Sequence, residues 1–198
     1  GGAKDAPKLS KIGGKIWQNN KDKAAAAAWD LAAELLQLEA KRQKADGLEF
    51  QPAPEWEFSF ASSFPYQETA DQQEAIETVL ADMSAAKPMD RLLCGDVGYG
   101  KTEVALRASF RAVMNGRQVA ILVPTTILAQ QHYQTFRSRM AAYPVRVELL
   151  SRYRSPAEQR QVLEKLQNGE VDIIIGTHRL LQKDVHIPFL GLLIIDEE

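Results

Sequence analysis

The sequence predicts a three-layer α/β domain with a parallel sheet, preceded by a long N-terminal α-helix. From residue 64 onward, short runs of Val, Ile and Leu alternate with amphipathic helical patterns, which is typical of a parallel sheet covered by helices. A glycine-rich loop joins one of these apolar runs to one of these helices. Residues 19–46, in contrast, form one uninterrupted pattern of Ala, Leu, Glu, Lys and Gln, which favour helices.

The N-terminal segment, residues 1–63, is expected to hold the long helix over residues 19–46 and an extended connector over residues 48–63. Gly47 stands where a helix commonly stops, and the prolines and aromatic residues after it favour an extended chain with aromatic anchors. The helix carries a wide apolar stripe that includes Trp29, so we expect this face to pack against another surface.

The second part, residues 64–198, is expected to form the α/β domain. Continuous apolar runs predict strands at residues 91–94, 119–123, 145–150, 171–175 and 192–195. Amphipathic patterns predict helices at residues 71–85, 101–115, 127–142 and 156–168. The single cysteine, Cys94, ends the first strand and is therefore expected to be a buried thiol.

The composition narrows the class of protein. The chain has 198 residues, 24 Lys and Arg against 26 Asp and Glu, a net charge of -2 and one cysteine. These values exclude collagen-like, mucin-like and strongly disordered chains, and one cysteine cannot form an intrachain disulfide. No run approaches the roughly 18 apolar residues of a membrane span, and the first residues lack the apolar core of a signal peptide. A cytoplasmic protein without membrane contact is expected.

The near-zero net charge hides a segregation along the chain. Residues 56–106 carry 3 basic and 9 acidic groups, a net charge of -6, whereas residues 107–160 carry 9 arginines and 2 acidic groups, a net charge of +7. Arginine suits a phosphate partner because its planar guanidinium binds two oxygens at once. A solvated helix face explains the same charge equally well.

The glycine-rich loop fits the pattern G-x-x-x-x-G-K-[ST] between an apolar run and a helical pattern. Its eight residues are Gly95, Asp96, Val97, Gly98, Tyr99, Gly100, Lys101 and Thr102. The glycines let backbone N–H groups surround a phosphate at the start of a helix. Lys101 is expected to neutralise the outer phosphates and the Thr102 hydroxyl to bind Mg²⁺.

A second acidic site follows the last apolar run. Residues 192–195 are four apolar residues, and Asp196, Glu197 and Glu198 come directly after them. Asp196 is expected to hold Mg²⁺, and Glu197 to orient or deprotonate the attacking water. Solvated caps at a strand end are the alternative, which the glycine loop makes less favourable.

Polar segments follow three further apolar runs, and ligands collect at the carboxyl ends of parallel strands. Hydroxyl groups, arginines and backbone N–H groups suit nucleic-acid phosphates, although each segment alone is equally explained as a turn or helix cap. The candidate residues are Pro124, Thr125, Thr126, Gln130, Ser151, Arg152, Arg154, Gly176, Thr177 and His178. The three histidines, His132, His178 and His186, are too scattered for a metal site, and we expect surface or cap roles for them.

Together these motifs resemble the first RecA-like lobe of superfamily-2 helicase motors, and among them the bacterial transcription-repair coupling factors. The resemblance covers residues 64–198 and rests on GDVGYGKT, PTTILAQQH, SRYRS, GTHRLL and LGLLIIDEE. The N-terminal segment resembles the linker that precedes the motor in those proteins. RecG-type fork-remodelling translocases share the glycine loop but typically have Gln where this chain has Glu198.

The resemblance implies an ATP-driven translocase on double-stranded DNA that displaces stalled RNA polymerase and helps to recruit the excision-repair damage-recognition protein. RNA polymerase and the repair protein would bind through other domains. Residues 95–102 would bind ATP, and Asp196, Glu197 and Glu198 would begin the family's DEEH box. Gln72 resembles the glutamine that reads adenine, with Phe64 as its packing partner.

The resemblance also implies parts that these 198 residues do not contain: a second lobe with its arginine finger and the His of the DEEH box. Such a finger accelerates hydrolysis by about 10³–10⁵. We therefore expect the fragment, truncated after Asp196–Glu198, to bind nucleotide weakly and to hydrolyse almost none. A RecG-like translocase and a non-catalytic docking module remain the alternatives.

Overall fold

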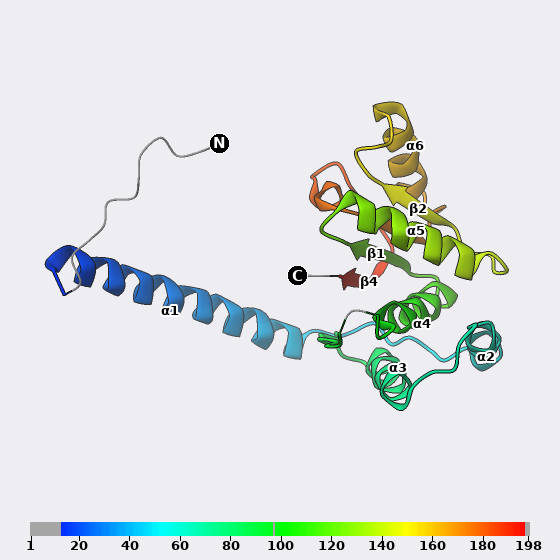
Figure 1. Cartoon of the computed structure of the whole chain (residues 1–198), viewed down its shortest axis with the longest axis horizontal. Helices are drawn as coiled ribbons and strands as arrows, with labels where there is room; N and C mark the ends of the chain where they lie inside the picture. Colours follow the sequence, from blue (N-terminus) through cyan, green and yellow to red (C-terminus); the bar gives the residue numbers. More distant parts are fainter. Residues whose placement is uncertain (1–12, 97, 197–198) are drawn as a thin grey trace. The chain divides into compact units, whose positions relative to one another are not determined.

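The computed structural model describes residues 13–96 and 98–196, and the chain divides into two units between Ala45 and Asp46 (Figure 1). The first unit is one long helix, α1, Lys15–Lys44. It starts four residues before the predicted helix and ends three residues before Gly47, with Lys41, Arg42 and Lys44 in its last turn. Basic side chains there stabilise the negative end of the helix dipole. Within α1, a fully described helix, no side chain is buried.

The second unit contains one parallel sheet of four strands in the order β2-β3-β1-β4 (Figure 1). The strands are β1 (Gln118–Leu122), β2 (Val147–Leu150), β3 (Ile173–Gly176) and β4 (Leu190–Ile195). Each of them overlaps a predicted apolar run. Because all four strands are parallel, their carboxyl ends lie at one edge of the sheet.

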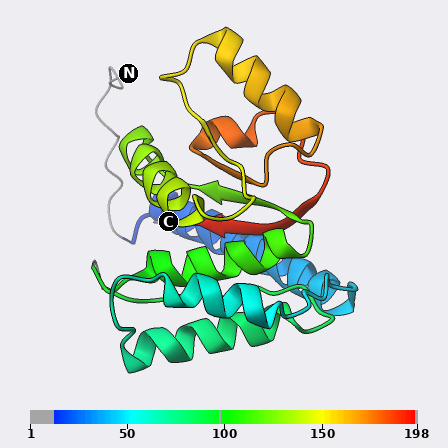
Figure 2. The same cartoon turned by 90° about the vertical axis from the view of Figure 1, so that its right-hand side faces the viewer.

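Helices cover both faces of this sheet, so the predicted three-layer α/β fold is confirmed (Figure 2). Helices α4 (Lys101–Met114) and α5 (Thr126–Met140) pack on the face that carries Ile121 and Ile175. Helix α6 (Pro156–Gln167) packs on the opposite face, against Ile174. The turn η1 (His178–Leu181) follows β3. Helices α2 (Pro54–Ser62) and α3 (Ala70–Met83) lie against α4, on its side away from the sheet.

The strand predicted at residues 91–94 is wrong. These residues precede the glycine loop but pair with no strand in the described part of the chain, and Leu92 is 83% exposed. The Arg91 Nε donates to the Asp82 carboxylate at 2.7 Å, which ties the segment to α3 and not to the sheet. Cys94 is consequently exposed, and the prediction of a buried thiol is also wrong.

The extended connector predicted at residues 48–63 is wrong over its second half, which forms α2. Pro54 occupies the first turn of α2, where its missing N–H costs nothing, and the Glu57 carboxylate accepts from the Ala53 N–H at 3.2 Å. The Phe60 ring is fully buried and stacks on Phe110 of α4, with 4.3 Å between ring centroids. One aromatic anchor thus docks a whole helix.

An ion pair reinforces this docking. The Arg111 Nη2 and Nε of α4 donate to the two Glu57 oxygens at 2.5 and 2.7 Å. Burial alone would raise the pKa of Glu57, but the hydrogen bonds from Arg111 and Ala53 outweigh burial and lower it. The carboxylate therefore stabilises the fold above its unfolded pKa near 4.3, and this contribution is lost as the pH falls through the lower folded value.

We expect Phe60→Ala to lower the free energy of unfolding by about 3–5 kcal/mol, because it leaves a cavity between α2 and α4. Urea denaturation followed by circular dichroism measures this loss. Phe58→Ala is the matched control, since Phe58 lies on the same helix and is 75% exposed. Equal losses in the two variants would contradict the packing described for α2.

None of the described helices is long and apolar enough to cross a membrane.

Candidate nucleotide site and neighbouring strand ends

The glycine loop leads directly into α4, as its sequence pattern predicts. Gly98 and Gly100 have φ angles of 87° and 76°, in the left-handed region that residues with a Cβ rarely adopt. Gly100 is the N-cap of α4. A Cβ at Gly100 would lie 2.4 Å from the Gln72 Nε2, so any other residue here would displace the Gln72 amide as well as strain the backbone. Val97 lies outside the described residues.

Lys101 closes the loop on itself. Its Nζ donates to the carbonyl oxygen of Gly95 and, at 3.0 Å, to that of Asp96. The ammonium therefore lies against the backbone of the loop that the pattern assigns to phosphate. An anion in the loop would compete with these two carbonyls for the same charge.

Gln72 is held between its own helix and the glycine loop. Its Oε1 accepts from the Thr69 N–H at 3.0 Å, while the Thr69 hydroxyl accepts from the Gln72 N–H, so the two form a capping box at the start of α3. The Gln72 Nε2 donates to the Tyr99 carbonyl at 2.7 Å. Gln72 thus contacts the glycine loop. Phe64 is half-buried, and its ring centroid lies 5.6 Å from the guanidinium carbon of Arg139.

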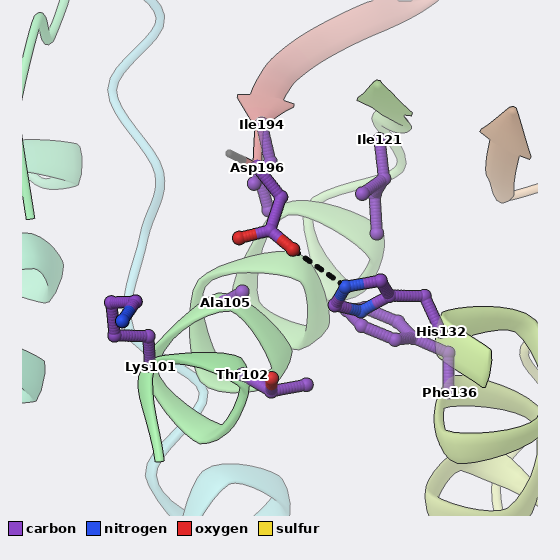
Figure 3. Close-up of a pocket in the computed structure, with 8 residues that line it drawn as sticks. All are labelled: Lys101, Thr102, Ala105, Ile121, His132, Phe136, Ile194 and Asp196. Carbon is purple, nitrogen blue, oxygen red and sulfur yellow. Dashed lines mark hydrogen bonds and ion pairs between the residues drawn. The ribbon is translucent and has the colours of Figure 1, made fainter. Parts of the chain in front are cut away.

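A small pocket brings Lys101 and Thr102 together with Asp196 and His132 (Figure 3). Its apolar lining comes from Ala105, Ile121, Phe136 and Ile194. The Asp196 N–H donates to the Leu122 carbonyl at 2.9 Å, which continues the pairing of β4 with β1 by one residue. Glu197 and Glu198 lie outside the described residues.

The residues of this pocket fit a magnesium ion. Mg²⁺ prefers oxygen ligands, usually one or two from the protein, with water and phosphate oxygens completing the shell. The Thr102 hydroxyl and the Asp196 carboxylate are such oxygens, and they line the same pocket at the start of α4. The side chain of Asp196 is 28% exposed, so it remains accessible to an ion.

His132 was not expected at this pocket, and the prediction of a surface or cap role for it is wrong. Its Nε2 lies 2.7 Å from the Asp196 Oδ2, and its side chain is only 13% exposed. The sequence does hold a signal for this placement. His132 lies three residues after Ala129 and four before Phe136, both fully buried, so helical spacing puts it on the core-facing side of α5.

An ion-pair network behind the glycine loop was not predicted from the sequence. The carboxylate of Glu103 accepts from the Arg107 Nε at 2.6 Å and from the Arg139 Nη2 at 2.9 Å. The Arg107 Nη2 also donates to Glu68 at 2.6 Å. A hydrogen bond from its own backbone N–H, followed by the Arg107 guanidinium, lowers the pKa of Glu68. The spacing of Glu103 and Arg107, four residues apart on a helix, predicts their pairing, but the contribution of Arg139 depends on the tertiary fold.

The other predicted strand-end residues lie at the carboxyl edge of the sheet, as the strand order requires. Residues 124–126 follow β1, residues 151–154 follow β2 and residues 176–178 follow β3. The Tyr153 side chain, which follows β2, is exposed and lies beside Arg152, whose guanidinium carbon is 5.9 Å from the Tyr153 ring centroid. The hydroxyl of Thr126, which follows β1, is the largest cause of a lowered pKa of Tyr153, and the Arg152 charge adds to it.

These residues differ in how accessible they are. Pro124, Thr125, Gln130, Arg152 and His178 are exposed, and Thr126, Arg154 and Thr177 are half-buried. Ser151 and Gly176 are buried. The Ser151 hydroxyl accepts from the Tyr153 N–H at 3.3 Å, and the Arg154 Nη1 lies 2.8 Å from Glu148. Ser151 and Arg154 therefore hold the turn after β2, and Arg152 is the guanidinium presented to solvent.

A comparison with protein families decides the assignment. The family model of the DEAD/DEAH box helicases matches residues 69–198, which include the glycine loop, the strand-end segments and Asp196. The chain belongs to the DEAD/DEAH box helicase family.

Individual proteins are similar to this helicase chain over nearly its whole length. It is 55% identical over 192 residues to the transcription-repair-coupling factor of Bacillus subtilis (strain 168), covering 97% of this chain and 16% of that protein. It is 54% identical over 198 residues to the transcription-repair-coupling factor of Escherichia coli (strain K12), covering 100% of this chain and 17% of that protein. The predicted resemblance to these factors is confirmed. The chain spans about a sixth of their length.

A solved structure shares the fold of this helicase chain. The structure of RecG bound to a three-way DNA junction matches with a TM-score of 0.77 and 40% identity, covering 82% of this chain and 22% of that chain. The similarity to transcription-repair-coupling factors is thus higher in identity and reaches the whole chain, including α1.

The influence of Thr126, after β1, on Tyr153, after β2, can be tested by titration. We expect Thr126→Val to raise the pKa of Tyr153 toward its ordinary value of about 10, because the largest cause of the lowering is removed. NMR of Tyr ring carbons over a pH titration, assigned with Tyr153→Phe, measures the change. Thr135→Val, an exposed position on α5, is the control. An unchanged pKa in Thr126→Val would show that the Thr126 hydroxyl does not act on Tyr153.

Proposed function

We propose that this chain is the first ATP-binding motor lobe of a DNA-dependent ATPase, a double-stranded DNA translocase that couples transcription to repair by displacing stalled RNA polymerase. The observation that carries the proposal is the meeting of two sites at one sheet edge. The glycine loop and Asp196 lie beside β4 and β1, and the strand-end segments extend along β1, β2 and β3. The high identity to transcription-repair-coupling factors supports the choice of cellular role.

In this proposal the residues around the glycine loop bind and orient ATP. The backbone N–H groups at the start of α4 would face the phosphates, and Lys101 would exchange the Gly95 and Asp96 carbonyls for phosphate oxygens. Gln72, already against Tyr99, reads the adenine edge, and Phe64 packs near it. Thr102 and Asp196 would hold Mg²⁺, which would supply positive charge beside the phosphates. Glu197 orients or deprotonates the attacking water.

The strand-end segments would contact the DNA backbone. Hydroxyl groups and the N-terminus of α5 suit phosphate oxygens, and Arg152 adds a charge that DNA attracts without regard to sequence. RecG, whose solved structure is bound to a three-way DNA junction, has this fold, which supports a DNA partner for this chain. RNA polymerase and the excision-repair damage-recognition protein would bind other domains of a longer protein that acts in the bacterial cytoplasm.

The RecG likeness also supports a second candidate, a fork-remodelling translocase. The two candidates use the same lobe and differ in their partners. RNA polymerase binding by the longer protein separates them, because only the transcription-coupled translocase requires it.

We expect Lys101→Ala to weaken binding of fluorescent ADP to the 198-residue chain by at least about tenfold, the effect of losing one charge-assisted hydrogen bond to phosphate. Lys183→Ala, an exposed lysine beyond η1, is the matched control and is expected to bind like the wild type. The isolated chain is expected to turn over almost no ATP, since a finger in a second lobe accelerates hydrolysis by about 10³–10⁵. Equal affinities of the two variants, or rapid DNA-stimulated turnover, would contradict the assignment.

We expect Arg152→Ala to weaken binding to duplex DNA of any sequence and to reduce the slope of log affinity against log salt by about 1. Fluorescence anisotropy over a range of salt concentrations measures both quantities. Arg160→Ala removes another exposed arginine, from α6 on the other face of the sheet, and should leave the slope unchanged. A slope that is the same in both variants would exclude Arg152 from the DNA path.

A further inference from the structure

The contact between His132 and Asp196 has no role in the sites described so far. It joins the middle of α5 to the carboxyl end of β4, two elements separated by 64 residues of sequence. The Asp196 carboxylate has no hydrogen to give, so the His132 Nε2–H donates to its Oδ2. The second carboxylate oxygen points away from His132 (Figure 3). Within the described residues, one oxygen of Asp196 is therefore hydrogen-bonded and the other has no side-chain bond that would exclude a ligand.

We propose that His132 is a positioning residue for the magnesium-binding carboxylate. By holding the Oδ2 of Asp196, it keeps Oδ1 turned toward the space shared with Lys101 and Thr102. The inference rests on the proposed function, since it assigns His132 a role at the same Mg²⁺ site. A partner of this kind, behind a metal ligand, commonly determines ligand orientation and metal affinity.

The backbone contacts of Asp196 do not by themselves fix the orientation of its carboxylate, so that role falls to His132. The backbone of Asp196 is held by its N–H bond to Leu122, but its side chain is 28% exposed and the rotation of a carboxylate about its last bond is broad. Within the part of the chain that the structure describes, the side-chain group that bonds to this carboxylate is the His132 Nε2. Without that bond, both oxygens would be free to turn to solvent.

The imidazole itself is well held. The His132 side chain is 13% exposed, and its ring lies 6.3 Å from the Phe136 ring, measured between centroids. Phe136 is fully buried, and Ala129, one turn before His132, is also fully buried. A donor that is itself immobilised can fix the orientation of its acceptor, which a solvated side chain could not do.

A purely structural strut between α5 and β4 is the competing role for His132. The two roles differ in one measurable respect. A strut affects stability and nucleotide affinity whether or not metal is present. A positioning residue affects the Mg²⁺-dependent part of nucleotide affinity alone.

The test uses the 198-residue chain and fluorescent ADP, titrated with and without Mg²⁺. We expect His132→Ala to raise the Mg²⁺ concentration for half-maximal effect by about 10- to 100-fold, while ADP affinity without Mg²⁺ stays at the wild-type value. His132→Gln, whose amide can donate near the position of Nε2, should restore most of the Mg²⁺ response. Gln134→Ala, exposed on the same helix, is the matched control. Mn²⁺ binding in the presence of ADP, followed by electron paramagnetic resonance, gives a readout that needs no hydrolysis.

The outcomes separate the inference from the function on which it rests. Wild-type binding of ADP with a Mg²⁺ response that His132→Ala leaves unchanged overturns the role of His132 and leaves the nucleotide site intact. Equal losses with and without Mg²⁺, or no recovery in His132→Gln, identify a structural strut and also overturn it. No ADP binding by the wild type at any Mg²⁺ concentration overturns the proposed function and the inference together. A melting curve for each variant checks that it is folded.

Discussion

The buried carboxylate of Glu103 is the constraint on which the nucleotide end of the domain depends. It is 4% exposed and lies two residues after Lys101, in the first turn of the helix that begins at the glycine loop. A buried carboxylate is costly unless charged donors surround it, and losing one partner of such a pair costs about 3–5 kcal/mol. Arg107 and Arg139 are those donors. The first turn of α4 is therefore fixed relative to α5.

The two arginines extend this constraint to the segments on either side. Arg107 also binds Glu68, directly before the capping box that orients Gln72. Arg139 also donates to the Ser63 hydroxyl at 2.6 Å, at the end of α2. The strand order places the remaining partners, because β4 and β1 are neighbours and deliver Asp196 and α5 to the same edge. Electrostatics positions the helices of the site and the sheet positions its carboxylate.

The sequence predicts those elements that are encoded by neighbouring residues, and it fails where an element depends on a distant partner. The glycine loop and the apolar runs of β1 to β4 are encoded within a few neighbouring residues, and these elements lie where the sequence places them. The segment at residues 91–94 has the composition of a strand, but a strand also needs a hydrogen-bonding neighbour, which no local pattern reports. Helix α2 depends on Phe60 meeting Phe110, 50 residues away. The helical spacing of His132 from two buried residues indicates that it is buried, but its contact with Asp196 depends on the tertiary fold.

Helix α5 connects the two halves of the site as one rigid body. It begins at Thr126, in the segment that we assign to DNA, and reaches His132 six residues later, about 9 Å along the axis at 1.5 Å per residue. Its far end is held through Arg139 by Glu103, and its start is capped by the Thr125 hydroxyl, which accepts from the Leu128 N–H at 3.2 Å. Because a helix transmits a displacement along its length, a phosphate that pulls on the first turn must either move His132 or break the cap. The same helix thus carries, at its start, the hydroxyl groups proposed to contact DNA and, at its middle, the imidazole that contacts Asp196. Under the proposed function, one helix would therefore join the DNA-contacting segment to the carboxylate proposed to hold Mg²⁺.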